Sequence, residues 1–96
     1  MANIYDVGDK IRLSVTFTSG VTPTDPTAVV CKVKEPDGTI TTATYALAQI
    51  IKDSAGVYHY DTTIDQAGRH WYRFEGTGTV VAAAEADFMA RESEFA

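Results

Sequence analysis

The sequence of 96 residues contains one cysteine, Cys31, so it cannot form an internal disulfide bond. Small domains that fold in oxidising compartments often depend on disulfides, and this lack favours folding in a reducing cytosol. No apolar run approaches the roughly 18 residues of a membrane-spanning helix, and the first residues lack the basic and apolar regions of a secretory signal. We therefore expect a protein that does not enter a membrane.

Basic residues are also scarce. Eight Lys and Arg stand against 13 Asp and Glu, which gives a formal net charge of −5. A nucleic-acid-binding protein needs a basic surface to displace counterions from phosphates, and anionic membranes likewise attract basic segments. The charge therefore predicts no nucleic-acid partner and no membrane partner.

Motifs for catalysis and cofactor binding are missing as well. The sequence has no G-x-S-x-G elbow and no phosphate-binding loop, and residues 76–78 (Gly-Thr-Gly) are typical of a turn. Cys31 alternates with valines, which predicts a buried, unreactive thiol. His59 and His70 have no Cys or Glu at ligand spacing, so they are a weak signal for a metal site. We expect no enzyme, no cofactor and no catalytic or metal-binding residues.

What the chain does contain is a strong period of two. Residues 10–18 alternate between polar and apolar side chains, a pattern typical of a half-buried β-strand. The residues expected on its buried face are Ile11, Leu13, Val15 and Phe17. The alternation of Val29, Cys31 and Val33 predicts a second strand of the same kind.

Further strands follow between turn sequences. Residues 40–51 predict one or two short strands with Tyr45 and Leu47 as their buried residues. Residues 57–64, 69–76 and 80–90 predict three more strands. The segments between them are rich in Gly, Pro, Asp and Ser, which favour turns.

About seven short strands without an amphipathic helix predict an all-β fold, an immunoglobulin-like antiparallel β-sandwich. The length is that of one domain, so we assign residues 1–96 to a single immunoglobulin-like domain with flexible arms at residues 1–5 and 91–96. The alternative for the first arm is that Ile4 and Tyr5 form the first strand of the sandwich.

The most specific local motif is DQAGRHWY at residues 65–72. In immunoglobulin-like sandwiches, a turn of this kind precedes a strand whose inward tyrosine bonds through its hydroxyl to the backbone of the corner. Tyr72 fits that role. By alternation, His70 and Phe74 share its buried face.

Trp71 falls on the opposite face of the same strand and has two interpretations. It either packs under a loop or at a sheet edge, or it is exposed between Arg69 and Arg73 as the anchor of an interface, because Trp and Arg are enriched at binding hot spots. Phe95, near the C-terminus, is an apolar residue that an assembly would bury. The candidate interface residues are therefore Trp71, Arg69, Arg73 and Phe95.

Three stretches together resemble a known family. They are YDVGDKIRL at residues 5–13, VKEPDGT at residues 33–39 and AGRHWYRFEG at residues 67–76. The chain resembles, over nearly its whole length, the small stand-alone immunoglobulin-like structural proteins of tailed bacteriophages and prophages. The resemblance implies an accessory part of the capsid, the head–tail connection or the tail, and it offers no catalytic residues.

We therefore expect a non-enzymatic virion protein of the capsid, neck or tail, made and folded in the host cytoplasm. Its partners would be other virion proteins and copies of itself. The alternative is a surface or carbohydrate-binding β-sandwich in which Trp71, Tyr58 and Tyr60 stack against sugars. Fold resemblance alone does not decide between these functions.

Overall fold

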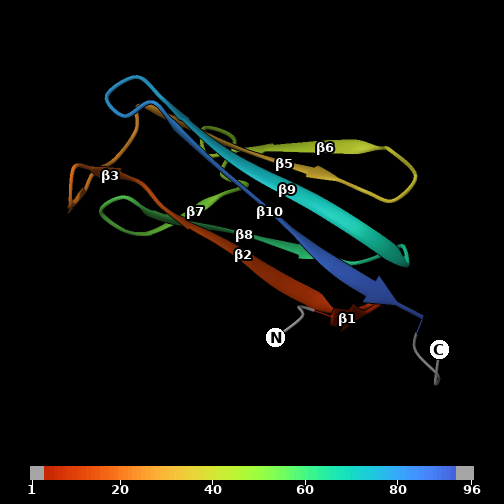
Figure 1. The fold of residues 1–96 in the computed structure, drawn as a ribbon. Helices are drawn as coiled ribbons and strands as arrows, with labels where there is room; N and C mark the ends of the chain where they lie inside the picture. Colours follow the sequence, from red (N-terminus) through yellow and green to blue (C-terminus); the bar gives the residue numbers. More distant parts are fainter. Residues whose placement is uncertain (1–3, 93–96) are drawn as a thin grey trace.

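The structure, a computed structural model, describes residues 4–92, and these form strands, turns and bends (Figure 1). The strands are β1 (Ile4–Asp6), β2 (Lys10–Thr16), β3 (Thr18–Ser19), β4 (Thr22–Pro23), β5 (Ala28–Lys34), β6 (Ile40–Thr44), β7 (Ile51–Ser54), β8 (Val57–Thr63), β9 (Gly68–Thr77) and β10 (Ala82–Arg91). Within residues 4–92 there is no helix, and so none long and apolar enough to cross a membrane.

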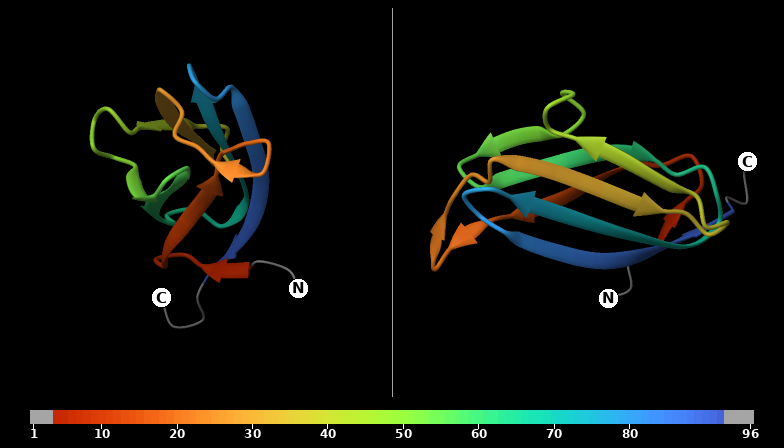
Figure 2. Two further views of the ribbon diagram at one scale, coloured as in Figure 1. Left: turned by 90° about the vertical axis from the view of Figure 1, so that its left-hand side faces the viewer. Right: turned by 90° about the horizontal axis from the view of Figure 1, so that it is seen from above.

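Two sheets face each other as the layers of a sandwich (Figure 2). The larger has the strand order β1-β10-β9-β5-β6 and the smaller the order β2-β8-β7, while β3 and β4 form a separate hairpin. All pairings are antiparallel except that of β1 with β10. The all-β sandwich is therefore confirmed, and this division of strands is compatible with an immunoglobulin-like arrangement.

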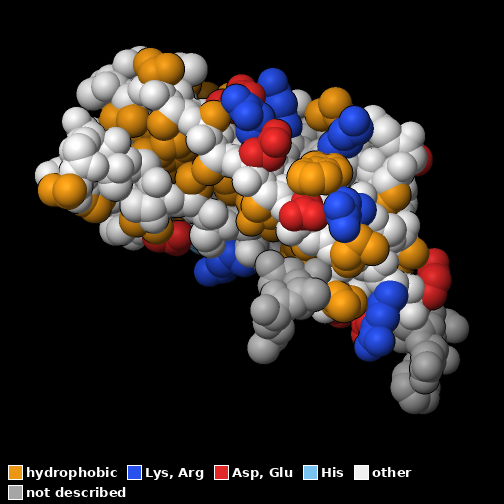
Figure 3. Space-filling model, in the orientation of Figure 1, with side chains coloured by type: hydrophobic (Ala, Val, Ile, Leu, Met, Phe, Trp, Pro, Cys, Tyr) orange, Lys and Arg blue, Asp and Glu red, His pale blue; other side chains and the backbone are white. Residues whose placement is uncertain are grey.

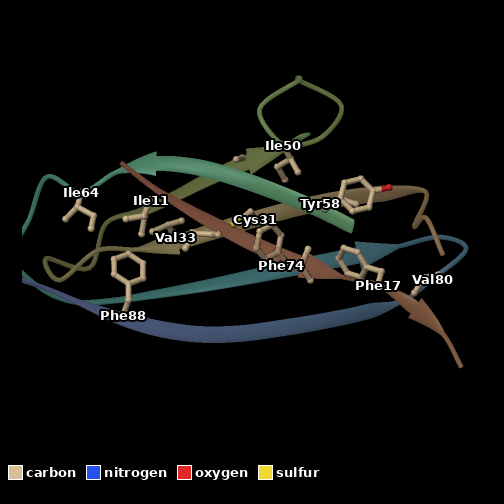
Figure 4. Close-up of a cluster of buried hydrophobic side chains, with 14 of the residues drawn as sticks. Ile11, Phe17, Cys31, Val33, Ile50, Tyr58, Ile64, Phe74, Val80 and Phe88 are labelled. Carbon is tan, nitrogen blue, oxygen red and sulfur yellow. The ribbon is translucent and has the colours of Figure 1, made fainter. Parts of the chain in front are cut away.

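The core lies between the layers and follows the predicted alternation. Ile11, Leu13, Val15 and Phe17 are buried, as expected. Across from them, β5 and β9 contribute Cys31 and Phe74, and Figure 4 shows these side chains between the two sheets. Fully burying a Val, Leu, Ile or Phe side chain stabilises the fold by about 1.5–3 kcal/mol.

The prediction for the segment after β6 was wrong. Tyr45 and Leu47 are 43% and 72% exposed, and the buried residues are Ala43 and Ile50. The reason is that β6 ends at Thr44 and the chain then turns back, so the residues that follow lie on a surface loop. A period of two cannot be extended through a turn.

The corner role predicted for Tyr72 was also wrong. Its ring packs between Phe74 and Phe88, with both centroids 6.2 Å away. Within residues 4–92, no hydrogen bond joins its hydroxyl to the corner backbone. Burial raises the pKa of Tyr72 above its ordinary value.

The boundaries of the expected arms need correction at both ends. Ile4 and Tyr5 belong to β1, whose register pairs them with Met89 and Ala90. Arg91 is the last residue of β10, and its Nε lies 2.8 Å from a carboxylate oxygen of Asp6. The first strand therefore contains Ile4 and Tyr5. Residues 1–3 and 93–96, including Phe95, lie outside the described residues.

Candidate functional site

Trp71 lies on β9, the middle strand of the five-stranded sheet. Its cross-strand neighbours are Asp87 on β10 and Lys34 on β5. Trp71 is 43% exposed, whereas His70, next to it on the strand, is buried in the interior. The predicted alternation along this strand is therefore confirmed, and Trp71 points outward.

We call the part of this sheet's outer surface that surrounds Trp71 the Trp71 face. It comprises Lys32, Lys34, Ile40, Arg69, Trp71, Arg73, Glu75, Glu85, Asp87 and Met89. Figure 3 shows apolar side chains surrounded by charged side chains of both signs on the surface that is turned to the viewer.

Arg69 covers part of the Trp71 ring. The guanidinium carbon lies 5.8 Å from the ring centroid, within the range of a cation–π contact. The Arg69 Nε is also 3.5 Å from a carboxylate oxygen of Asp87. Two contacts therefore restrict Arg69 beside the ring.

A second group of charges surrounds Arg73. Its Nε donates a hydrogen bond of 2.8 Å to Glu75, and its Nη1 lies 3.8 Å from Glu85. Lys32 lies 3.5 Å from the other carboxylate oxygen of Glu75. The hydrogen bond from Arg73 and the nearby Lys32 charge hold the pKa of Glu75 below its ordinary value. Because exposed ion pairs contribute little stability, this network mainly orients the side chains.

The charge of the face differs from that of the whole chain. Half of the eight Lys and Arg residues lie here, against three of the 13 Asp and Glu. The basic residues are Lys32, Lys34, Arg69 and Arg73, and the acidic residues are Glu75, Glu85 and Asp87. A chain with a net charge of −5 thus presents one face with a small positive excess.

A shallow depression of about 400 Å³ lies next to Trp71. Lys34 and Ile40 line one side of it, and Arg73 and Glu85 line another. Within residues 4–92, Lys34 has no carboxylate within ion-pair distance. The depression therefore combines an indole ring, an aliphatic side chain and an ammonium group.

The structure brings three of the four candidate residues together. Trp71, Arg69 and Arg73 share one face, while Phe95 lies outside the described residues. Lys32 and Lys34 were not identified from the sequence as part of this site. Their alternation with valines places them outward on β5, but the pairing of β5 with β9 is not readable from either strand alone.

The two histidines lie in different sheets. His59 on β8 has its Nδ1 2.8 Å from both carboxylate oxygens of Asp53. His70 on β9 stacks on Phe88 with a centroid separation of 4.7 Å. Over residues 4–92, no group of three or more His, Cys, Asp or Glu has a geometry suited to a metal ion.

The aromatic residues considered for sugar stacking do not form one platform. Tyr58 is buried, with its ring 5.4 Å from that of Tyr45, and Tyr60 is half-buried on the same strand. Both belong to the three-stranded sheet, whereas Trp71 is on the outer face of the other sheet.

Comparisons with known proteins give a structural neighbour. No protein-family model and no curated protein matches the sequence. Among solved structures, a DUF4785 family protein from Legionella pneumophila is similar, with a TM-score of 0.69 and 15% sequence identity over 93% of this chain. The match spans 26% of the Legionella chain, so this chain corresponds to about a quarter of that protein. At this identity, the likeness shows the fold alone.

Proposed function

We propose that this domain is a non-enzymatic structural protein that acts by binding other proteins through the Trp71 face. The observation that carries the proposal is the half-exposed indole of Trp71 at the centre of an outward sheet surface, with Arg69 held beside it. A tryptophan that a monomer leaves exposed offers a partner a large contact area at little cost in side-chain ordering.

The surroundings of Trp71 favour a protein partner. Protein interfaces concentrate aromatic residues and Arg near their centre and place polar groups at the rim. Here Ile40 and Trp71 supply the apolar centre, and charged pairs such as Arg73 with Glu85 supply the rim. Lys34, which has no ion-pair partner among residues 4–92, favours a partner that brings a carboxylate to the depression.

The proposed place of action is the virion. Support comes from the three stretches that resemble phage and prophage structural proteins, at residues 5–13, 33–39 and 67–76. In this proposal the chain is made in the host cytoplasm and joins a capsid, neck or tail, where its partners are other virion proteins and further copies of itself.

The test is incorporation into particles made by the phage or prophage that encodes the chain. Quantitative mass spectrometry of purified particles is expected to find the wild-type chain. Trp71→Ala should lower its occupancy at least about tenfold, the loss expected for a hot-spot residue. Leu47→Ala is the matched control, because Leu47 is an exposed apolar residue on a loop away from this face.

Two results would contradict different parts of the proposal. If the wild-type chain is absent from particles, the virion assignment is wrong. If Trp71→Ala and Leu47→Ala are incorporated equally well, the chain is a virion protein that uses another surface.

A further inference from the structure

The strand β10 is paired along only part of one edge. On one side β9 pairs with it from Ala82 to Ala90, but on the other side β1 pairs only with Met89 to Arg91. No other strand in the described part of the chain pairs with β10. Within residues 4–92, nothing therefore pairs with the outer edge of residues 82–88, which we call the uncovered edge, and β10 forms one margin of the molecule seen from above (Figure 2).

The direction of the backbone groups on this edge follows from one hydrogen bond. The N–H of Val7 donates to the C=O of Arg91 at 2.8 Å, so the carbonyl of Arg91 points away from β9. Backbone groups of alternate residues in a strand point the same way. Ala83, Glu85 and Asp87 therefore direct their N–H and C=O groups to the uncovered edge.

The side chains on the inner surface of this segment are small and incompletely covered. Ala84 lies opposite Phe74, which is buried, and so it faces the interior. Ala82 has the same parity, yet Ala82 and Ala84 are both exposed. The smaller sheet does not extend over this part of β10.

The other outer strands carry features that discourage pairing, and this part of β10 carries fewer. The sequence of β2 includes Lys10 and Arg12, and β7 has a register shift after Lys52. On β6, Gln49 bonds both the N–H and the C=O of Thr44. Lysines, bulges and blocked backbone groups are the usual protections of sheet edges. The uncovered part of β10 has no Lys, Arg, Pro or register shift.

We propose that β10 pairs antiparallel with β10 of a second copy of this chain, about a two-fold axis at Ala84. In this arrangement Ala84 lies opposite Ala84 of the second copy. Ala83 and Glu85 of each copy exchange backbone hydrogen bonds with Glu85 and Ala83 of the other. The inner side chains that meet are all alanines, so the two edges approach without steric conflict.

The charges and the bounds of β10 select this register. A two-fold axis at Glu85, Ala86 or Asp87 would place two carboxylates directly opposite each other, which is unfavourable across strands. An axis at Ala83 would need paired residues before Ala82, where β10 begins. The axis at Ala84 uses residues 82–86, all within the strand, and places each Glu85 opposite an alanine.

The pairing joins the two larger sheets into one continuous sheet. Because opposed side chains share a side of the sheet, the two Trp71 faces lie on the same surface of the dimer. A partner with two matching sites would then bind both at once, with a gain in avidity. The dimer itself does not depend on the proposed binding through Trp71.

Sedimentation equilibrium of the wild-type chain tests the association. The average mass should rise from the monomer value of 10.4 kDa toward twice that value. A small strand-to-strand interface predicts a dissociation constant between about 10 µM and 1 mM, so that range of concentrations is measured. Trp71→Ala should dimerise like the wild type, which separates this proposal from the function of the Trp71 face.

Two proline variants test the edge. Ala83→Pro removes an N–H that points to the uncovered edge of β10, so it should weaken association at least about tenfold. Thr42→Pro is the matched control. Thr42 has the backbone orientation of Thr44, whose N–H points away from β5, so this variant removes an edge N–H at the far side of the same sheet. It should leave association unchanged.

Cysteine cross-linking tests the register and does not depend on the proline variants. Ala84→Cys should form a dimer-linking disulfide under mild oxidation, because the residues directly opposed at the axis are close enough for one. Ala86→Cys should not, since residue 86 lies opposite residue 82 of the second copy. The buried Cys31 makes the wild type a suitable blank.

The proposal is overturned if the wild type stays monomeric, if both proline variants weaken association equally, or if Ala86→Cys cross-links as readily as Ala84→Cys.

Discussion

A carboxylate oxygen of Asp25 accepts a hydrogen bond of 2.8 Å from the N–H of Gly56, although 31 residues separate them in the sequence. The same carboxylate binds Lys52 and the hydroxyl of Tyr58. The C=O of Gly56 in turn accepts a hydrogen bond from the N–H of Phe17. Asp25 therefore ties the segment that leads into β5 to the turn between β7 and β8.

Gly56→Ala should destabilise the domain strongly. Gly56 has a φ of +74°, and a Cβ there would overlap the Phe17 carbonyl oxygen and lie 2.7 Å from the Thr24 nitrogen. The expected loss in unfolding free energy is above about 3 kcal/mol, since backbone strain and overlap add. Gly38→Ala is the control, because Gly38 has a φ of +91° with no atom within 4 Å of the added Cβ. Gly38→Ala should lower the free energy of unfolding, measured by urea denaturation, by only about 1–2 kcal/mol. Equal losses for the two variants would contradict the overlap at Gly56.

The ionised carboxylate of Asp25 should make the stability depend on pH. Hydrogen bonding to Lys52 and to the Gly56 N–H lowers its pKa in the folded state. The ionised carboxylate therefore stabilises the folded state fully at pH values above its unfolded-state pKa of about 3.9. This stabilisation is lost as the pH falls through its lower folded-state pKa. Asp25→Asn should therefore be less stable than the wild type at neutral pH, and the difference should shrink below about pH 4. Thermal unfolding midpoints measured at a series of pH values check this, and a difference that stays constant down to acid pH would contradict it.

Cys31 should resist thiol reagents in the folded protein. It is fully buried, and burial raises its pKa to about 12, so the reactive thiolate is disfavoured. Modification should be at least about 10³-fold slower than for a free thiol, because it requires unfolding. Stopped-flow labelling with and without denaturant measures the ratio. Rapid labelling of the native protein would show that the packing around β5 is not as described.

Two aromatic residues of β9, Trp71 and Phe74, should differ sharply in their effect on stability. Phe74→Ala leaves a cavity in the core and should lower the free energy of unfolding by about 3–5 kcal/mol. Trp71→Ala removes a side chain from the outer surface and should lower the free energy of unfolding by less than about 1 kcal/mol. Chemical denaturation of both variants compares the two losses. A large loss for Trp71→Ala would mean that this residue serves the fold and not an interface.

Much of the fold could be read from the sequence where the chain alternates regularly. The buried face of β2 and the inward Phe74 were predicted correctly, because one side of each strand must bury its side chains. The failures lie at turns and at contacts between distant segments. Leu47 was placed in the core because its strand was extended past Thr44, and the hydroxyl contact of Tyr72 was inferred from a motif whose surroundings differ here.

For the candidate site, the sequence determined that Trp71 and Arg73 point to one side of their strand and Phe74 to the other, because side-chain direction alternates with every residue. Only the tertiary structure decided that this side is open to solvent, and that Lys34 of β5 and Asp87 of β10 border it. The alternation within a strand fixes which of its faces is buried and so restricts the register, but it does not identify the partner strand, because pairing joins segments far apart in the chain. The same holds for the uncovered edge of β10, which among residues 4–92 is paired by β1 only at Met89, Ala90 and Arg91.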